Sequence, residues 1–248
     1  MQDGRADGTD PSGGPAEADA GYRRFPSPGE WARTVALAVG LFIFVRTFGV
    51  EAFKIPTGSM ESTLLVGDFL LVNKAAFGAR IPFTGVHLPA LADPERGAVV
   101  VFTPPHDPSK HYVKRLVGIP GDTLEMRDKV LYRNGFEVRE PYVQHRDRRR
   151  DTVHPDMRWQ SNHLVASTRH RYQPTRDNWG PLVVPHGQFF VLGDNRDNSE
   201  DSRYWGFVPR GALTGRPWIV YFSYDSKGRG PVGWWQGVRW SRMGHAIR

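Results

Sequence analysis

Residues 55–74 read I-P-T-G-S-M-E-S-T-L-L-V-G-D-F-L-L-V-N-K, and this stretch decides how the rest of the chain is interpreted. Pro56 and Gly58 predict a turn that presents Ser59 at an exposed tip, because proline fixes φ and glycine accepts the angles that turns require. Met60 and the apolar run after it predict an anchor in a hydrophobic core, and the end of the stretch predicts a strand. A serine presented on such a turn is a candidate nucleophile.

A serine hydroxyl needs a base to remove its proton. The candidate base is Lys114, in the strand-like segment H-Y-V-K-R-L-V-G-I-P-G-D at residues 111–122. A free lysine has a pKa of about 10.4, so almost none of it is neutral at pH 7. Desolvation can lower this pKa by two to three units, at a cost of roughly 3 to 4 kcal/mol, and Tyr112, Val113 and Leu116 supply apolar neighbours. The alternative is that Lys114 points outward from a half-solvated strand.

The nine histidines raise a rival mechanism, the Ser-His-Asp triad. Eight of them lie in loop-like or unpatterned sequence, and His111 only opens a strand. Since no histidine occurs in a context that would orient its ring, we prefer a dyad of serine and lysine.

A third segment, residues 193–206, reads G-D-N-R-D-N-S-E-D-S-R-Y-W-G. In this order the three segments resemble the motifs of the type I signal peptidases, membrane-bound Ser-Lys proteases that remove signal peptides from exported proteins. The resemblance covers roughly residues 32–242. It implies that Ser59 attacks the scissile carbonyl and forms an acyl-enzyme, that Lys114 is the general base, and that no metal or cofactor takes part.

The resemblance also implies the groups that support the dyad. Thr57 supplies an oxyanion donor beside the backbone N–H of Ser59, and such a donor is worth about 3 kcal/mol. Ser199 hydrogen-bonds the lysine amine and fixes its direction. One position departs from the family pattern, since Ser62 stands where most members have proline, and we expect a looser turn after the nucleophile.

Other polar residues are expected to keep the site in shape. The resemblance implies a structural ion pair between Asp201 and Arg203, with Arg115 nearby. Asp68 and Asp122 each follow a glycine, so the sequence predicts that they accept hydrogen bonds from backbone amides in turns and have no catalytic role.

The substrate implied by the resemblance is an exported preprotein with small residues at the Ala-X-Ala positions before the cut. It would lie as an added strand between residues 53–56 and 111–113, in shallow apolar pockets that reject large side chains. The residues expected to bind it are Phe53, Ile55, Pro56, Met60, Tyr112 and Val113.

Residues 31–53 contain a run without polar side chains from Val35 to Val45. At about 1.5 Å per residue, Val35 to Val50 span roughly 24 Å, short of a hydrocarbon layer of about 30 Å, so a buried core helix is one alternative. A secretory signal peptide is another, but no small-residue cleavage pattern follows. Arg46 near one end and flanking aromatic residues favour a single transmembrane helix in the cytoplasmic membrane. Arg23, Arg24 and Arg33 precede it, so we expect the tail to stay cytoplasmic and the catalytic domain to lie outside.

The net charge of +7 is compatible with binding to nucleic acid or to an anionic membrane surface. No zinc-ligand spacing or nucleic-acid-binding motif accompanies the charge, so we expect the lipid bilayer, and no nucleic acid, as a partner. The chain has no cysteine, which excludes a thiol protease and a cysteine-ligated zinc site. The C-terminal tryptophans and arginines are expected either to rest on lipid or to close the β core.

Short strand-like runs with little helical periodicity after residue 53 predict a mainly β catalytic domain, built as a barrel or sheet. Asp128-Lys129 and Asn134-Gly135 are typical of hairpin turns. Residues 142–178 are rich in arginine, and we interpret them as an inserted, solvated β-ribbon or loop rather than as a binding site. The predicted order is a disordered cytoplasmic tail (1–30), a transmembrane helix (31–53), a first catalytic part (54–141), the insertion (142–178) and a second catalytic part (179–248).

Three functions are compatible with these patterns. The preferred one is a membrane-bound serine endopeptidase of the signal peptidase I type. A self-cleaving repressor of the same Ser-Lys type would need a DNA-binding domain, and none is apparent before Trp31. The third is a membrane-tethered binding module in which Ser59 and Lys114 are inert.

Overall fold

The structure is a computed structural model that describes residues 27–78, 89–147, 151–165, 172–225 and 235–247. The chain divides into two compact units, Met1–Leu41 and Phe42–Arg248, and each is described by itself. Residues 1–26 of the predicted tail, and the first of the C-terminal tryptophans at position 234, lie outside the described residues.

Helix α1 (Pro28–Phe48) begins within the predicted tail and ends before Phe53, where the predicted span ends. Ser27 and Glu30 cap its start reciprocally, since the side chain of each accepts a hydrogen bond from the N–H of the other. Phe53 instead belongs to strand β1 (Val50–Lys54), which pairs with a neighbouring strand. Among the described residues, no helix has the length and apolar character that a membrane crossing requires. The side chain of Arg46 is not described.

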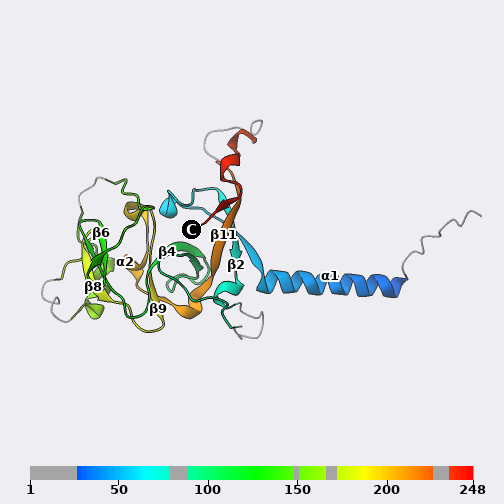
Figure 1. Ribbon diagram of the computed structural model, residues 1–248, viewed down its shortest axis with the longest axis horizontal. Helices are drawn as coiled ribbons and strands as arrows, with labels where there is room; N and C mark the ends of the chain where they lie inside the picture. Colours follow the sequence, from blue (N-terminus) through cyan, green and yellow to red (C-terminus); the bar gives the residue numbers. More distant parts are fainter. Residues whose placement is uncertain (1–26, 79–88, 148–150, 166–171, 226–234, 248) are drawn as a thin grey trace, which may run out of the picture. The chain divides into compact units, whose positions relative to one another are not determined.

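A curled sheet of eight strands forms the larger part of the catalytic unit (Figure 1). Its strands pair antiparallel in the order β1-β2-β11-β3-β4-β9-β10, and β12 pairs with β11. The long strand β11 joins β2 to β3 and shifts register along both partners, and such shifts bend a sheet. Besides β1, the strands are β2 (Asp68–Asn73), β3 (Val99–Phe102), β4 (Tyr112–Gly118), β9 (Gln188–Leu192), β10 (Val208–Pro209), β11 (Leu213–Ser223) and β12 (His245–Ala246).

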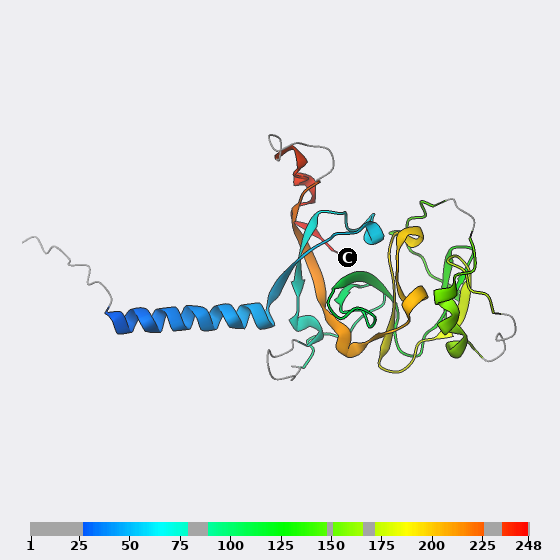
Figure 2. The same ribbon diagram turned by 180° about the vertical axis from the view of Figure 1, so that it is seen from behind.

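A second sheet of four strands, in the order β7-β6-β5-β8, lies beside β9 (Figure 2). Its strands are β5 (Thr123–Arg127), β6 (Val130–Arg133), β7 (Phe136–Glu137) and β8 (Trp179–Val183). Both predicted hairpin turns are confirmed, with positive φ at Asp128, Lys129, Asn134 and Gly135. Leu124 of this sheet and Phe190 of β9 belong to one hydrophobic cluster, which fixes the two sheets against each other.

Residues 142–178 were expected to form a solvated β-ribbon or loop, and their described part is not a ribbon but a loop with isolated bridges and the 3-10 helix η3 (Pro155–His163). Met157 is fully buried in the cluster between the sheets, and Gln160 is buried beside it. Two buried side chains make no clear periodicity in a polar sequence, so the sequence pattern did not reveal a packed element. The other short helices are η1 (Gly58–Met60), η2 (Ala75–Phe77), η5 (Arg196–Asn198), α2 (Ser202–Trp205), η6 (Arg210–Ala212) and η8 (Trp240–Arg242).

The central strands β3 and β4 are covered on both faces. Along β3, Val99 and Val101 belong to one hydrophobic cluster, whereas Val100 and Phe102 belong to another. Because side chains alternate between the faces of a strand, these two clusters lie on opposite faces of the sheet. A side chain in the middle of β4 is therefore enclosed whichever face it points to, and this includes Lys114.

Candidate active site

Ser59 lies in the single turn of η1, directly after β1. Asn195 holds this turn with two hydrogen bonds, from its N–H to the Ser59 carbonyl at 3.0 Å and from its Nδ2 to the Gly58 carbonyl at 3.2 Å. Met60 is buried in the core, as predicted. The turn is confirmed, but Ser59 is only 8% exposed, so its tip is covered and not exposed as expected.

The turn after the nucleophile was expected to be loose at Ser62, but the structure shows that this residue is held in place. Its φ is 97°, a value that proline cannot adopt. Its hydroxyl donates a hydrogen bond to the Tyr142 carbonyl, at the start of the predicted insertion. The residue that replaces the family's proline therefore ties the nucleophile turn to a distant segment.

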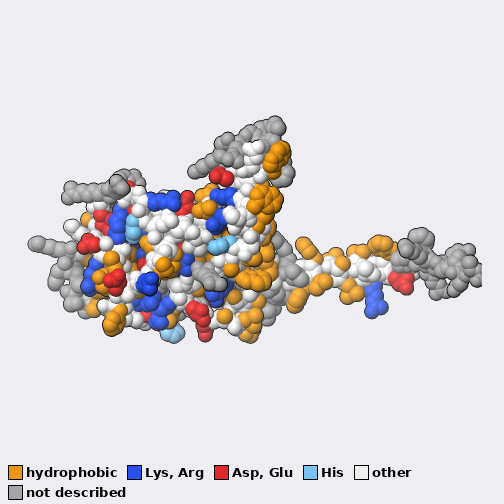
Figure 3. Space-filling view, turned by 45° about the horizontal axis from the view of Figure 1, so that its top comes forward, with side chains coloured by type: hydrophobic (Ala, Val, Ile, Leu, Met, Phe, Trp, Pro, Cys, Tyr) orange, Lys and Arg blue, Asp and Glu red, His pale blue; other side chains and the backbone are white. Residues whose placement is uncertain are grey.

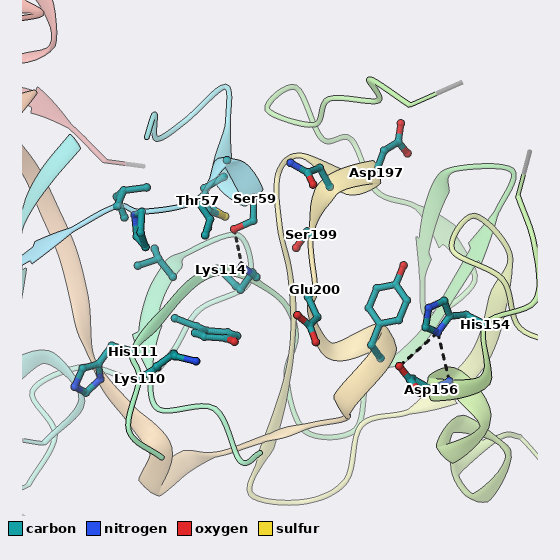
Figure 4. A pocket seen from close by; sticks show the side chains of 18 residues that line it. Thr57, Ser59, Lys110, His111, Lys114, His154, Asp156, Asp197, Ser199 and Glu200 are labelled. Carbon is teal, nitrogen blue, oxygen red and sulfur yellow. Dashed lines mark hydrogen bonds and ion pairs between the residues drawn. The ribbon is translucent and has the colours of Figure 1, made fainter. Parts of the chain in front are cut away.

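Lys114 reaches the serine from β4. Its Nζ lies 2.7 Å from the Ser59 Oγ and donates a hydrogen bond to it, and Figure 4 shows the two side chains pointing toward each other. The Lys114 residue is 4% exposed. The alternative of an outward-facing lysine is wrong, because β4 is a central strand with both faces covered.

Desolvation lowers the pKa of Lys114 from 10.5 to about 8. The carboxylates of Asp201 and Glu200 act in the opposite direction, because a nearby negative charge favours the ammonium form. With a pKa of about 8, roughly a tenth of the amine is neutral at pH 7, compared with a few in ten thousand for free lysine. The burial of β4 therefore supplies a usable base.

Thr57 and Ser199 lie on either side of the dyad. Thr57 precedes η1 and does not cap it with its side chain, so its hydroxyl is free of that bond. Among the described residues, the buried Ser199 Oγ has no hydrogen-bond partner, so the expected bond to Lys114 is not formed. Gly193 approaches closely here, since a Cβ on it would lie 2.2 Å from the Ser199 Oγ and 2.5 Å from the Ser59 carbonyl oxygen. Only glycine fits this position.

The structure places Asp201 and Arg203 in a buried ion pair, with Nε to Oδ1 at 2.8 Å and Nη2 to Oδ2 at 2.9 Å. Burial alone would raise the pKa of Asp201, but the Arg203 guanidinium and the N–H of Gly193 hold it below its usual value. Arg203 also donates to the carbonyls of Arg196 and Ser199. The pair therefore fixes the loop that carries Ser199.

Arg115 was expected near the Asp201–Arg203 pair, and its own ion-pair partner is Asp194. It forms a buried two-point ion pair with Asp194, at 2.8 and 2.7 Å, and its Nη2 also donates to the Thr63 Oγ1 at 3.1 Å. The Tyr142 ring stacks on the Arg115 guanidinium, whose Cζ lies 3.8 Å from the ring centroid. This cluster joins β4, the chain after Ser59 and the loop after β9.

Asp68 and Asp122 are confirmed as turn residues. The Asp68 carboxylate accepts a hydrogen bond from the Leu65 N–H at 2.8 Å, and Asp122 accepts one from the Ile119 N–H at 3.0 Å. Each also pairs with an arginine, which the sequence did not reveal.

An open cavity of about 850 Å³ lies over the dyad. Of the residues expected to bind substrate, the structure brings these to its wall: Ile55, Pro56, Met60, Tyr112 and Val113. Phe53 is not part of the wall and instead packs its ring against His111, with centroids 5.2 Å apart. Within the described ranges, no cluster of three or more histidine, aspartate or glutamate side chains is arranged to hold a metal ion.

Sequence reasoning missed two groups of residues at this site. Asn195 and Asp194 lie in the segment already recognised, and their neighbours could have suggested a role in shaping the turn. His154 and Asp156 come from the arginine-rich segment and line the far end of the cavity. No pattern in that segment pointed to the site.

Comparison with known proteins identifies relatives over most of the chain. A family model described as "Signal peptidase, peptidase S26" matches residues 29–222, which include all three recognised segments. The signal peptidase I of Pseudomonas aeruginosa is 39% identical over 210 residues, covering 79% of this chain and 72% of that protein. The signal peptidase I of Pseudomonas fluorescens is 36% identical over 208 residues, and the probable signal peptidase I-2 of Synechocystis sp. is 35% identical over 201 residues. These two cover 79% and 78% of this chain, respectively, and 72% of each relative.

Proposed function

The chain belongs to the signal peptidase family of peptidase S26, and from this premise we propose that it is a membrane-bound serine endopeptidase that removes signal peptides from exported preproteins. One observation carries the proposal: a buried lysine amine lies 2.7 Å from the hydroxyl of a serine on a fixed turn. The cavity above these two groups is open to solvent and has a volume of about 850 Å³.

In the proposed mechanism the neutral Lys114 amine takes the proton of Ser59 as the Oγ attacks the scissile carbonyl. The N–H of Ser59 and the hydroxyl of Thr57 stabilise the oxyanion. Lys114 then gives its proton to the leaving amine, which departs with the mature protein. In the second half, Lys114 removes a proton from water, which hydrolyses the ester on Ser59.

Ser199 acts as a positioning residue for Lys114 in this mechanism. Its hydroxyl is buried and has no partner among the described residues, so it can accept a hydrogen bond from the amine when Lys114 turns away from Ser59. The loop that carries Ser199 is held by the Asp201–Arg203 pair, which we propose to be structural and not catalytic.

The substrate is proposed to add a strand between the end of β1 and the start of β4, with small side chains facing the wall. Ile55 and Met60 are 3% and 1% exposed and leave little room beside the dyad. We expect these residues and Val113 to select small residues at the first and third positions before the cut.

The catalytic unit is proposed to work at the outer face of the cytoplasmic membrane. Three tryptophans near the C-terminal end of the chain are widely exposed: Trp218 (65%), Trp235 (54%) and Trp240 (67%). Figure 3 shows hydrophobic side chains gathered along this part of the surface. Exposed tryptophan is typical of surfaces that rest at the interface of a bilayer. We propose α1 as the anchor because it carries large exposed apolar side chains, including Leu41 and Phe42.

The test is cleavage of a purified preprotein that carries an Ala-X-Ala site, with the products weighed by mass spectrometry. We expect one cut, directly after the second alanine, and no loss of rate when a strong chelator is added. Replacing that alanine by leucine should lower kcat/KM by at least about 10²-fold, because the pocket beside Ser59 is too shallow for it. Cutting at unrelated sites, or loss of activity with the chelator, would refute the proposal.

A further inference from the structure

The cavity continues beyond the dyad, on the side away from Ile55 and Pro56. Figure 4 shows that the wall there comes from the loop after β9 and from the arginine-rich segment, which lies far from both catalytic residues in the sequence. The side chains on this side are Ser199, Glu200, Tyr204, His154 and Asp156. Of these, the proposed dyad chemistry uses only Ser199.

This side of the cavity carries two carboxylates that form no close ion pair with a lysine or arginine among the described residues, although Glu200 also acts on Lys114 and Lys110 at longer range. Among the described residues, the exposed Glu200 carboxylate has no hydrogen bond or ion pair. The Asp156 side chain is 71% exposed, and its ionic contact within the described residues is with His154, at 3.7 Å. By contrast, Lys110 on the opposite wall is neutralised by Asp107 at 2.7 Å.

A buried hydroxyl without a hydrogen-bond partner among the described residues accompanies these carboxylates. The Ser199 hydroxyl lies between the dyad and Glu200, is more than nine-tenths buried and has no partner within the described residues. A buried hydroxyl without a hydrogen-bond partner is rare, and one that faces a cavity indicates that a bound molecule supplies the missing hydrogen bond. While the Lys114 amine is hydrogen-bonded to Ser59, the available partner for the Ser199 hydroxyl is a peptide group of the substrate.

Tyr204 adds an aromatic face to the same wall. Its ring packs edge-on against His154, with centroids 5.0 Å apart, which holds both rings in place. The Arg203 guanidinium already lies 5.5 Å from the centroid of the Tyr204 ring, so the two carboxylates are what favours a further cation here. The wall therefore has the chemistry to bind a basic side chain.

We propose that Glu200, Asp156 and Tyr204 form a subsite that selects a lysine or arginine among the first three residues after the cut. The inference rests on the proposed function: if the signal peptide lies along β1 and β4, the chain after the cut leaves toward this wall. The arginine-rich segment, which the sequence did not mark as a binding site, thereby takes part in choosing substrates.

The test uses peptides that share one Ala-X-Ala site and carry lysine, glutamine or glutamate at the first, second or third position after the cut. For the wild-type enzyme at low salt, we expect kcat/KM for lysine to exceed that for glutamate by about fivefold or more at one position. The ratio should shrink at 0.5 M salt, because exposed charges are screened. In the double variant Glu200→Gln, Asp156→Asn, the ratio of kcat/KM for lysine to kcat/KM for glutamate at low salt should fall below about twofold.

Glu137→Gln is the matched control, because Glu137 is an exposed carboxylate on β7 outside the cavity. It should leave both the rates and the ratio unchanged. A wild-type ratio near one at all three positions, or a ratio that survives in the double variant, would overturn the subsite. If the wild-type enzyme cuts none of the peptides, the proposed function itself fails, and the subsite fails with it.

Discussion

Lys114→Met will abolish cleavage and at the same time make the protein more stable near pH 7. Without the amine, nothing near Ser59 can take its proton, and loss of a dyad member should lower kcat/KM by at least about 10⁴-fold. Methionine fills a similar volume without a charge. Wild-type Lys114 is protonated at a cost, since burial lowers its pKa from 10.5 to about 8, and this shift corresponds to about 3 kcal/mol.

The sign of this stability effect depends on pH. Below pH 8 the amine is protonated in both the folded and the unfolded chain, so the wild-type protein bears the whole cost. Between pH 8 and 10.5 the cost declines, and above 10.5 it vanishes because the amine is neutral in both states. Lys114→Met also loses the hydrogen bond to Ser59. After subtracting it, we expect the free energy of unfolding of this variant to exceed that of the wild type by about 2 kcal/mol at pH 7 and by less at pH 10.

Urea unfolding at both pH values, together with a peptide assay, checks this prediction. Ser59→Ala is the matched control: it should be equally inactive, yet close to wild-type stability, because it removes no buried charge. Activity above one per cent of wild type in Lys114→Met would remove the lysine from the mechanism. An inactive but destabilised Lys114→Met would show that its loss of activity is unfolding.

Arg203→Met will destabilise the protein by about 3 to 5 kcal/mol, because it leaves the Asp201 carboxylate buried without its partner. The Arg203 side chain is 1% exposed and Asp201 is 0% exposed, so water cannot replace the guanidinium. The folded pKa of Asp201 is lowered, so the pair stabilises the protein above the usual carboxyl pKa of about 4 and loses this effect as the pH falls. Urea unfolding at pH 7 measures the loss.

Arg210→Met is the control for this second variant. Arg210 also forms an ion pair, with Asp93 at 2.8 Å, but the two side chains are 46% and 87% exposed. Removing it should cost less than about 1 kcal/mol. If Arg203→Met cost no more than Arg210→Met, the buried pair would not be what fixes the loop around Ser199.

The sequence predicted the parts of the site that depend on local signals. The turn at Ser59 follows from Pro56 and Gly58, and the hairpin at Asp128-Lys129 follows from residues that accept positive φ. The enclosure of Lys114 does not follow from local signals, since a strand with apolar neighbours can be central or half-solvated. Strand β4, which carries Lys114, lies between β3 and β9, and this central position encloses the side chain. The order of strands in a sheet cannot be read from the local sequence.

What the sequence did not reveal depends on contacts between distant segments. The expectation that Arg115 lies near the Asp201–Arg203 pair named no partner for it, and nothing in the sequence singled out Asp194, with which it forms a buried ion pair. Ser62 was expected to loosen the turn, but its hydroxyl finds the Tyr142 carbonyl. The role of residues 142–178 was missed because burial there rests on a few side chains, such as Met157, in an otherwise polar stretch.

The central claim is that burial keeps the Lys114 amine partly neutral beside Ser59. The most direct measurement is a titration of the Lys114 Nζ by NMR in protein with labelled lysine, with the signal assigned by its absence in Lys114→Met. The account predicts a pKa of about 8 for this amine. A value near 10.4, the ordinary value for lysine in water, would contradict it.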